Sequence, residues 1–70
     1  LTDAADLLVD MMKEIGKWYN IDIEFRNSEI MNLRMHFLAN RQQKVSDLIE
    51  LLNRMERIHV YLEGESLIIE

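Results

Sequence analysis

The spacing of apolar residues changes sharply once in the first third of the chain. Over residues 2–19 apolar residues recur at helical spacing, whereas after Asn20 they alternate strictly with acidic ones. This fall in period from about 3.6 to 2 predicts a helix that ends near Tyr19 and a half-buried strand over Ile21–Arg26. Trp18 and Tyr19 lie at the change of period. We expect both rings to seal the helix end against the strands.

The predicted first helix carries an unusually wide apolar face. Its apolar residues fill an arc of roughly 200° when successive residues are placed at about 100° steps. A helix on one flat surface needs an apolar stripe only a little wider than ~100°, so this helix should be covered from two directions, for instance by a sheet and a second helix. Thr2 or Asp3 can cap its N-terminus. Gly16 indicates close approach by a neighbouring backbone.

The remaining pattern predicts a second helix and three more strands, with an apolar loop (residues 27–33) that returns to the core. The second strand is expected over Arg34–Ala39, with Leu33, Met35 and Phe37 pointing inward. The second helix begins at Asn40 or nearer Lys44 and runs to about Arg57. A hairpin of residues 58–62 and 67–69 around Gly64 closes the chain. The order is α-β-β-α-β-β, which is an α+β domain.

Composition narrows the class of protein. Seventy residues form a single domain spanning residues 1–70, and because the sequence begins at Leu1 we interpret it as excised from a longer protein. The formal charge of -5 and the scattered arrangement of its eight basic residues disfavour a nucleic-acid partner. We find no stretch of ~18 apolar residues, so we expect no insertion of this domain into a membrane. There is no cysteine, which excludes disulfides and thiolate metal sites.

No residue pattern in the chain indicates catalysis. His36 and His59 lie on predicted strands without a metal-ligand partner at close spacing, so surface positions are the preferred interpretation. Carboxylates fall mostly on polar helix arcs and outward strand positions, where nothing would hold two of them in a cleft. Most of the five methionines lie on predicted core faces. We therefore predict a domain that is not an enzyme and holds neither a metal nor a cofactor.

Binding through shape is the chemistry that remains. We expect the final strand, Ser66–Glu70, to present unpaired backbone groups at a free edge, where a partner strand can add. The alternative is that a strand preceding Leu1 covers an edge in the full protein. The predicted binding surface combines the last strand with the outward face of its hairpin. Its candidate residues are His59, Tyr61, Ser66, Ile68 and Glu70.

The residues around the change of period also resemble a known family. The segment Lys17–Phe25, with its Trp-Tyr-Asn-Ile junction leading into an alternating strand, is similar to the C-terminal domain of FecR-type anti-sigma factors. The core residues that carry this signature are Trp18, Tyr19, Ile21, Ile23 and Phe25. The resemblance continues through residues 27–37, the helix at Val45–Leu52, and the closing hairpin with Gly64 and Leu67–Ile69.

The resemblance implies a fold akin to the secretin and TonB short N-terminal domain. In that fold two βαβ-like repeats place their helices side by side against small sheets, and the first strand would here lie before Leu1. The resemblance also implies that this chain is a periplasmic domain of a single-pass inner-membrane protein. The expected partners are the signalling domain of an outer-membrane TonB-dependent transporter and, through a cytoplasmic segment outside this chain, a sigma factor.

Two other interpretations stay open at this point. The alternative closest in kind is the N-terminal signalling domain of a TonB-dependent transporter, which shares the fold. The Trp18-Tyr19 junction favours the anti-sigma factor over it. A small ferredoxin-like enzyme or nucleic-acid-binding domain is a third class, disfavoured by the acidic charge and the missing motifs.

Overall fold

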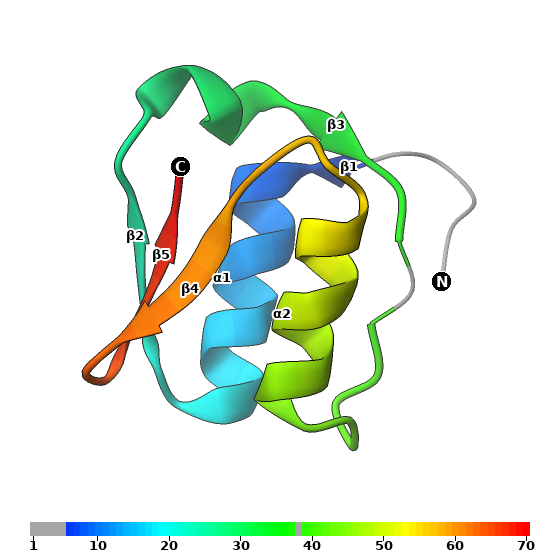
Figure 1. The fold of residues 1–70 in the computed structure, drawn as a ribbon, viewed down its shortest axis with the longest axis vertical. Coiled ribbons are helices and arrows are strands. Elements are labelled where there is room, and N and C mark those ends of the chain that lie inside the picture. Colours follow the sequence, from blue (N-terminus) through cyan, green and yellow to red (C-terminus); the bar gives the residue numbers. More distant parts are fainter. Residues whose placement is uncertain (1–5, 38) are drawn as a thin grey trace.

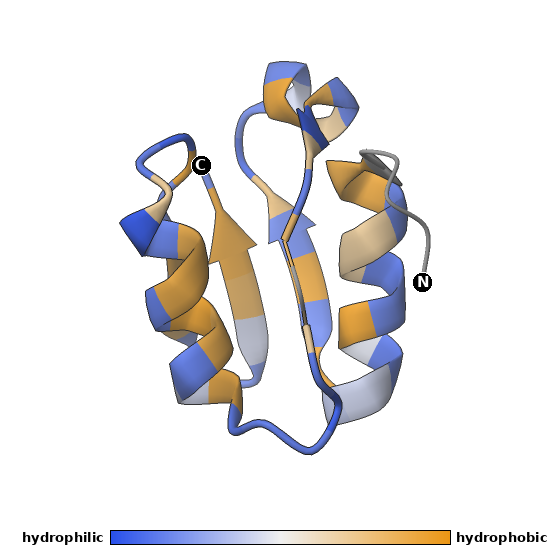
Figure 2. Ribbon diagram, turned by 90° about the vertical axis from the view of Figure 1, so that its right-hand side faces the viewer, coloured by the Kyte–Doolittle hydropathy of each residue, from blue (hydrophilic) through white to orange (hydrophobic). Residues whose placement is uncertain are grey.

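Two helices lie side by side and pack against one face of a small sheet (Figures 1 and 2). The computed structural model describes residues 6–37 and 39–70. In chain order the elements are β1 (Asp6–Leu7), α1 (Leu8–Tyr19), β2 (Asp22–Phe25), the 3-10 helix η1 (Ser28–Asn32), β3 (Arg34–Met35), α2 (Val45–Arg54), β4 (Val60–Glu63) and β5 (Ser66–Ile69). The predicted α+β class, with paired helices against small sheets, is confirmed.

Within the described residues the strands form two separate sheets. The larger has the order β2-β5-β4, in which β5 pairs in parallel with β2 and antiparallel with β4. The smaller is the antiparallel pair of β1 and β3. The closing strand of the chain is therefore the central strand of the larger sheet.

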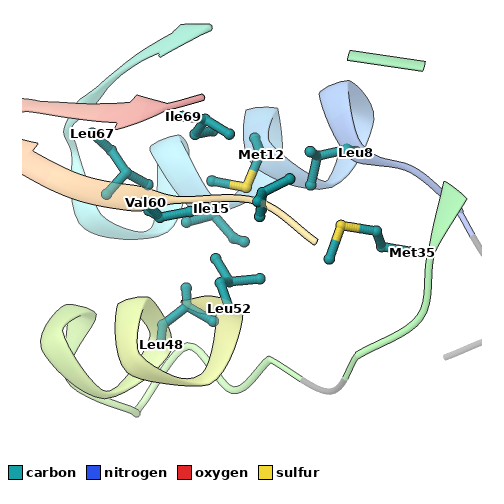
Figure 3. Packing of buried hydrophobic residues seen from close by; sticks show 10 residues of the cluster. Leu8, Met12, Ile15, Met35, Leu48, Leu52, Val60, Leu67 and Ile69 are labelled. Atoms are coloured by element: carbon teal, nitrogen blue, oxygen red, sulfur yellow. The ribbon is translucent and has the colours of Figure 1, made fainter. Parts of the chain in front are cut away.

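The core fills the space between the helices and the larger sheet. Figure 3 shows side chains from α1, α2, β4 and β5 converging there, with Met35 of β3 closing one end. The core residues of this cluster are Leu8, Met12, Ile15, Met35, Leu48, Leu52, Ile58, Val60, Leu67 and Ile69. Trp18 and Tyr19 are half-buried and pack against this cluster, as do Ile21, Ile23 and Phe25. All five signature residues thus contribute to the periphery of the core.

The end of α1 is fixed by the predicted junction. Asn20 adopts the left-handed conformation with φ 54°, which ends the helix, and its backbone N–H donates to the Gly16 carbonyl. The N–H of Ile21 also donates to that carbonyl, at 3.1 Å, and the chain then enters β2. The Tyr19 hydroxyl donates to the Gln43 carbonyl at 2.6 Å, which holds the connection to α2 against the helix end. The prediction that the helix ends at Tyr19 is confirmed.

The start of α1 differs from the prediction. The helix begins at Leu8, because Asp6–Leu7 is extended and pairs with β3, and the Leu8 N–H donates to the Leu33 carbonyl at 2.8 Å. A first strand therefore lies within the chain, where the sequence had placed helix. The expected caps, Thr2 and Asp3, lie outside the described residues.

The second predicted strand is also shorter than expected. It spans Arg34–Met35, and the two described residues of β1 are its only pairing partners among residues 6–37 and 39–70. The inward side chains are nevertheless as predicted, since Met35 is buried and Leu33 and Phe37 pack against the core. Leu38, which belongs to the predicted strand, lies outside the described residues.

The start of α2 is one of the two that the sequence left open, whereas its end differs from the prediction. Lys44 is the N-cap residue and Val45 begins the helix. Asn40 and Gln43 instead close a turn, in which the Gln43 N–H donates to the Asn40 carbonyl at 2.9 Å. The helix ends at Arg54 rather than Arg57, because the chain turns through Glu56 at φ 58°.

The close approach predicted at Gly16 is confirmed and gives a test of the α1–β2 packing. A Cβ there would lie 3.0 Å from Ile23 Cγ1 and 3.1 Å from the Ile21 carbonyl oxygen. Overpacking of this kind costs about 1–3 kcal/mol, which should outweigh the gain of about 1 kcal/mol in helix propensity. We expect Gly16→Ala to lower the free energy of unfolding by about 1 kcal/mol in urea titrations.

The matched control is Ser46→Ala on the exposed side of α2. This change should stay within about 0.5 kcal/mol of the parent because the Ser46 side chain is exposed. A Gly16→Ala variant as stable as the parent would show that β2 yields without cost.

Candidate protein-interaction site

The face of the larger sheet that points away from the helices carries mostly polar side chains. We call it the outer sheet face. Strand register places its residues in three rows across β2, β5 and β4. Pairing extends one residue beyond the start of β4 and the end of β5, where the backbones of His59 and Glu70 exchange hydrogen bonds of 2.8 and 2.9 Å. The rows are Asp22–Ser66–Glu63, Glu24–Ile68–Tyr61 and Arg26–Glu70–His59.

Arg26 joins the two outer strands across this face. Its Nε donates to Glu24 Oε2 at 2.8 Å on its own side of the sheet. On the opposite side, Nη1 donates to the Tyr61 hydroxyl at 3.0 Å and Nη2 to Glu63 Oε2 at 3.2 Å. The guanidinium therefore reaches across β5, which lies between. The hydrogen bond to Glu24, with smaller effects of Tyr61 and Glu63, raises the pKa of Arg26 above its ordinary value.

This cluster orders the face more than it stabilises the fold. The Arg26 side chain is 41% exposed, and its two carboxylate partners are more exposed still. Ion pairs at such exposure contribute little, because water and salt screen them. The stability that this raised pKa contributes is fully present while the pH is below the ordinary pKa of arginine. It is lost only when the pH rises through the raised pKa. The Arg26 guanidinium therefore keeps its positive charge throughout the neutral range.

The five predicted partner-binding residues do lie together on the outer sheet face. They differ in accessibility: His59 and Glu70 are exposed, Tyr61 and Ser66 are half-buried, and Ile68 is only 1% exposed. Ile68 lies between Glu24 and Tyr61 in the middle row, in the strand that Arg26 crosses. His59 faces Glu70 with 3.4 Å between Nδ1 and Oε1, and its ring lies 5.2 Å from that of Tyr61. Their role in binding stays a prediction.

The expectation that the last strand has a free edge is wrong. Strand β5 pairs on both sides, so it offers no edge at all. The physical reason is its run of three apolar residues, Leu67–Ile69, which are buried on both faces of the sheet. A partner that pairs with this sheet must use β2 or β4.

The edge of β4 is occupied at Val60 by a side chain from α2. The Asn53 amide nitrogen donates to the Val60 carbonyl at 2.8 Å, and Asn53 Oδ1 accepts from the Val60 N–H at 2.7 Å. Asn53 thus takes the place that a neighbouring strand would fill at Val60.

The edge of β2 is different. The N–H groups of Asp22 and Arg26 donate to β5, at 3.2 and 2.9 Å. Because backbone groups alternate in direction along a strand, those of Ile23 and Phe25 face away from the sheet. Within residues 6–37 and 39–70, no hydrogen bond to these outward groups is found. Strand β2 therefore provides an open pairing edge.

Sequence reasoning missed both edges and the Arg26 cluster. The apolar run Leu67–Ile69 was a signal for a central strand, and reading it so would have moved the free edge elsewhere. No local pattern pointed to Asn53 or to the partners of Arg26. Both histidines are exposed, and the described part of the chain gathers no three His, Asp or Glu residues that could hold a metal ion. None of its helices is long and apolar enough to cross a membrane.

The role of Asn53 gives a direct test of edge protection. Asn53→Ala leaves the Val60 N–H and carbonyl without their partner, which should lower the free energy of unfolding by about 2 kcal/mol. The amide of Val60 should then exchange its hydrogen faster. Asn53→Asp keeps an acceptor for that N–H, so slow exchange should survive there. If the alanine variant exchanges as slowly as the parent, Asn53 does not protect the edge.

Comparison with known proteins supplies the identity. The family model described as FecR, C-terminal, matches residues 6–69, which is nearly the whole chain. Comparisons with curated proteins and with solved structures gave no match. The matched range includes the Trp18–Phe25 junction, both helices and the closing hairpin. The chain therefore belongs to the FecR C-terminal family, as the C-terminal domain of a FecR-type anti-sigma factor.

Proposed function

We propose that this domain is the periplasmic signalling end of an inner-membrane anti-sigma factor. It contacts the signalling domain of an outer-membrane TonB-dependent transporter and relays the state of that transporter. The family match over residues 6–69 is the observation that carries this proposal. The output reaches the sigma factor, and so transcription, through a cytoplasmic segment outside this chain. No bond is made or broken in this domain.

The geometry supports a role in protein contact. Strand β2 presents outward backbone groups, and the outer sheet face beside it carries side chains held in place by Arg26. A signal of this kind needs only a difference in affinity between two states of the transporter. If the binding free energies of the two transporter states differ by about 1.4 kcal/mol, their dissociation constants differ tenfold. The fraction of this domain that is bound can then differ up to tenfold between the two states.

The test is direct binding of this 70-residue chain to intact transporters. Each TonB-dependent transporter of the same organism is purified in detergent and titrated by calorimetry. We expect a transporter with an N-terminal signalling domain to bind with a dissociation constant of about 1 μM, corresponding to about −8 kcal/mol. Transporters that lack such a domain are the control and should not bind. If no transporter with a signalling domain binds, the proposed partner is wrong.

A further inference from the structure

The two edges of the larger sheet are treated unequally by the fold. At β4, Asn53 satisfies both backbone groups of Val60, which leaves only those of Leu62 facing outward on that strand. At β2, the outward groups of Ile23 and Phe25 have no such partner within the described ranges 6–37 and 39–70. Free edges pair readily with added strands, and proteins commonly guard them with charged side chains, lysine above all, with proline or with a bulge. The four residues of β2, Asp-Ile-Glu-Phe, include neither lysine nor proline, their pairing with β5 is regular, and their only guard is the negative charge of Asp22 and Glu24.

Apolar surface accompanies the open edge of β2. The side chains of Ile23 and Phe25 are only half-buried although both pack against the core. Helix α1 approaches the strand closely at Gly16, and Val9, two turns earlier on the same helical face, is also half-buried. A strand added beside β2 could bury its inward side chains against these residues.

Charge decides which occupant fits. The outward side chains of β2 are the exposed carboxylates of Asp22 and Glu24. A second copy of this chain pairing along the same edge would bring carboxylates against carboxylates, and like charges on adjacent strands are destabilising. A strand that alternates apolar and basic residues would place its apolar side chains beside Ile23 and Phe25 and its basic ones beside Asp22 and Glu24.

We propose that the edge of β2 docks an extended segment of the transporter that alternates apolar and basic residues and adds as a fourth strand to the sheet. This inference rests on the proposed function for the identity of the partner. Backbone pairing at Ile23 and Phe25 supplies the affinity, while the alternation supplies the specificity.

Hydrogen exchange on the parent protein provides the first test, because it needs no variant. Addition of a transporter that binds should slow exchange of the Ile23 and Phe25 amides at least tenfold. The Tyr61 amide, which faces β5 within the sheet, is the internal reference. If the transporter binds and the two β2 amides gain no protection, the docking site is wrong although the proposed function stands.

Substitution at Ile23 separates the contribution of its backbone to binding from the contribution of its side chain. Ile23→Pro and Ile23→Ala both lose the isoleucine side chain, but only proline removes the outward N–H. That N–H makes no hydrogen bond within residues 6–37 and 39–70, so its removal breaks none there. We expect the proline variant to bind the transporter at least tenfold more weakly than the alanine variant. Equal affinities of the two variants would overturn the proposal.

Charge reversal tests the chemistry of the partner. Asp22→Lys should weaken binding at least tenfold, whereas Asp47→Lys, the same change at an exposed position on α2, should leave it within twofold. Equal weakening by both would show a diffuse effect of net charge and would overturn pairing at β2.

Protection of the β2 amides that rises with the concentration of this chain alone would identify a second copy as the occupant, which also overturns the proposal. If no transporter binds the parent, the docking proposal falls together with the proposed function.

Discussion

The double pairing of β5 is the constraint on which the rest of the structure depends. This strand lies between β2 and β4, and its residues Leu67–Ile69 are almost fully buried. Strand β4 is its neighbour in a tight hairpin, but β2 lies more than 40 residues earlier in the sequence. Within the described residues β2 pairs with no other strand. The sheet that supports both helices is therefore completed only by the last residues of the chain, and contacts of such high sequence separation form at a large entropic cost.

The turn between α1 and β2 shows how nearby residues place β2 where it can pair with the distant strand β5. Asn20 ends the helix in the left-handed conformation, which asparagine tolerates better than most residues. The lack of a side chain at Gly16 lets Ile21 and Ile23 approach the helix so closely that a Cβ there would be crowded. Tyr19 then ties the helix end to the connection before α2 through its hydroxyl. Asn20 thus ends the helix, Gly16 leaves room for the strand, and Tyr19 holds the loop. All three residues lie within about one helical turn.

The sequence predicted those elements whose signals are local, and it failed where pairing is distant. The helix end at Tyr19, the alternation in β2 and the hairpin around Gly64 follow from residue type and period alone. The first strand was missed because Asp6–Leu7 fits a helical pattern equally well, and only pairing with β3 makes it extended. Arg26 reaches partners 35 and 37 residues away, which no period encodes. For the candidate site, the structure confirms that the five predicted residues share one face of the sheet, but the predicted free edge at the last strand is wrong.

The two carboxylates on the outward side of β2 are not equivalent, and this bears on how a strand could align there. Glu24 is held by Arg26 at 2.8 Å, which partly neutralises it, whereas no ion pair involves Asp22 among residues 6–37 and 39–70. A basic side chain on an incoming strand therefore gains more beside Asp22 than beside Glu24. A slip of one residue would turn the apolar side chains of that strand toward solvent, and a slip of two would move its base to the neutralised carboxylate. Arg26 thus has a second consequence beyond bridging the sheet, because it leaves one end of the edge more negative and so makes the registers of a paired strand unequal in energy.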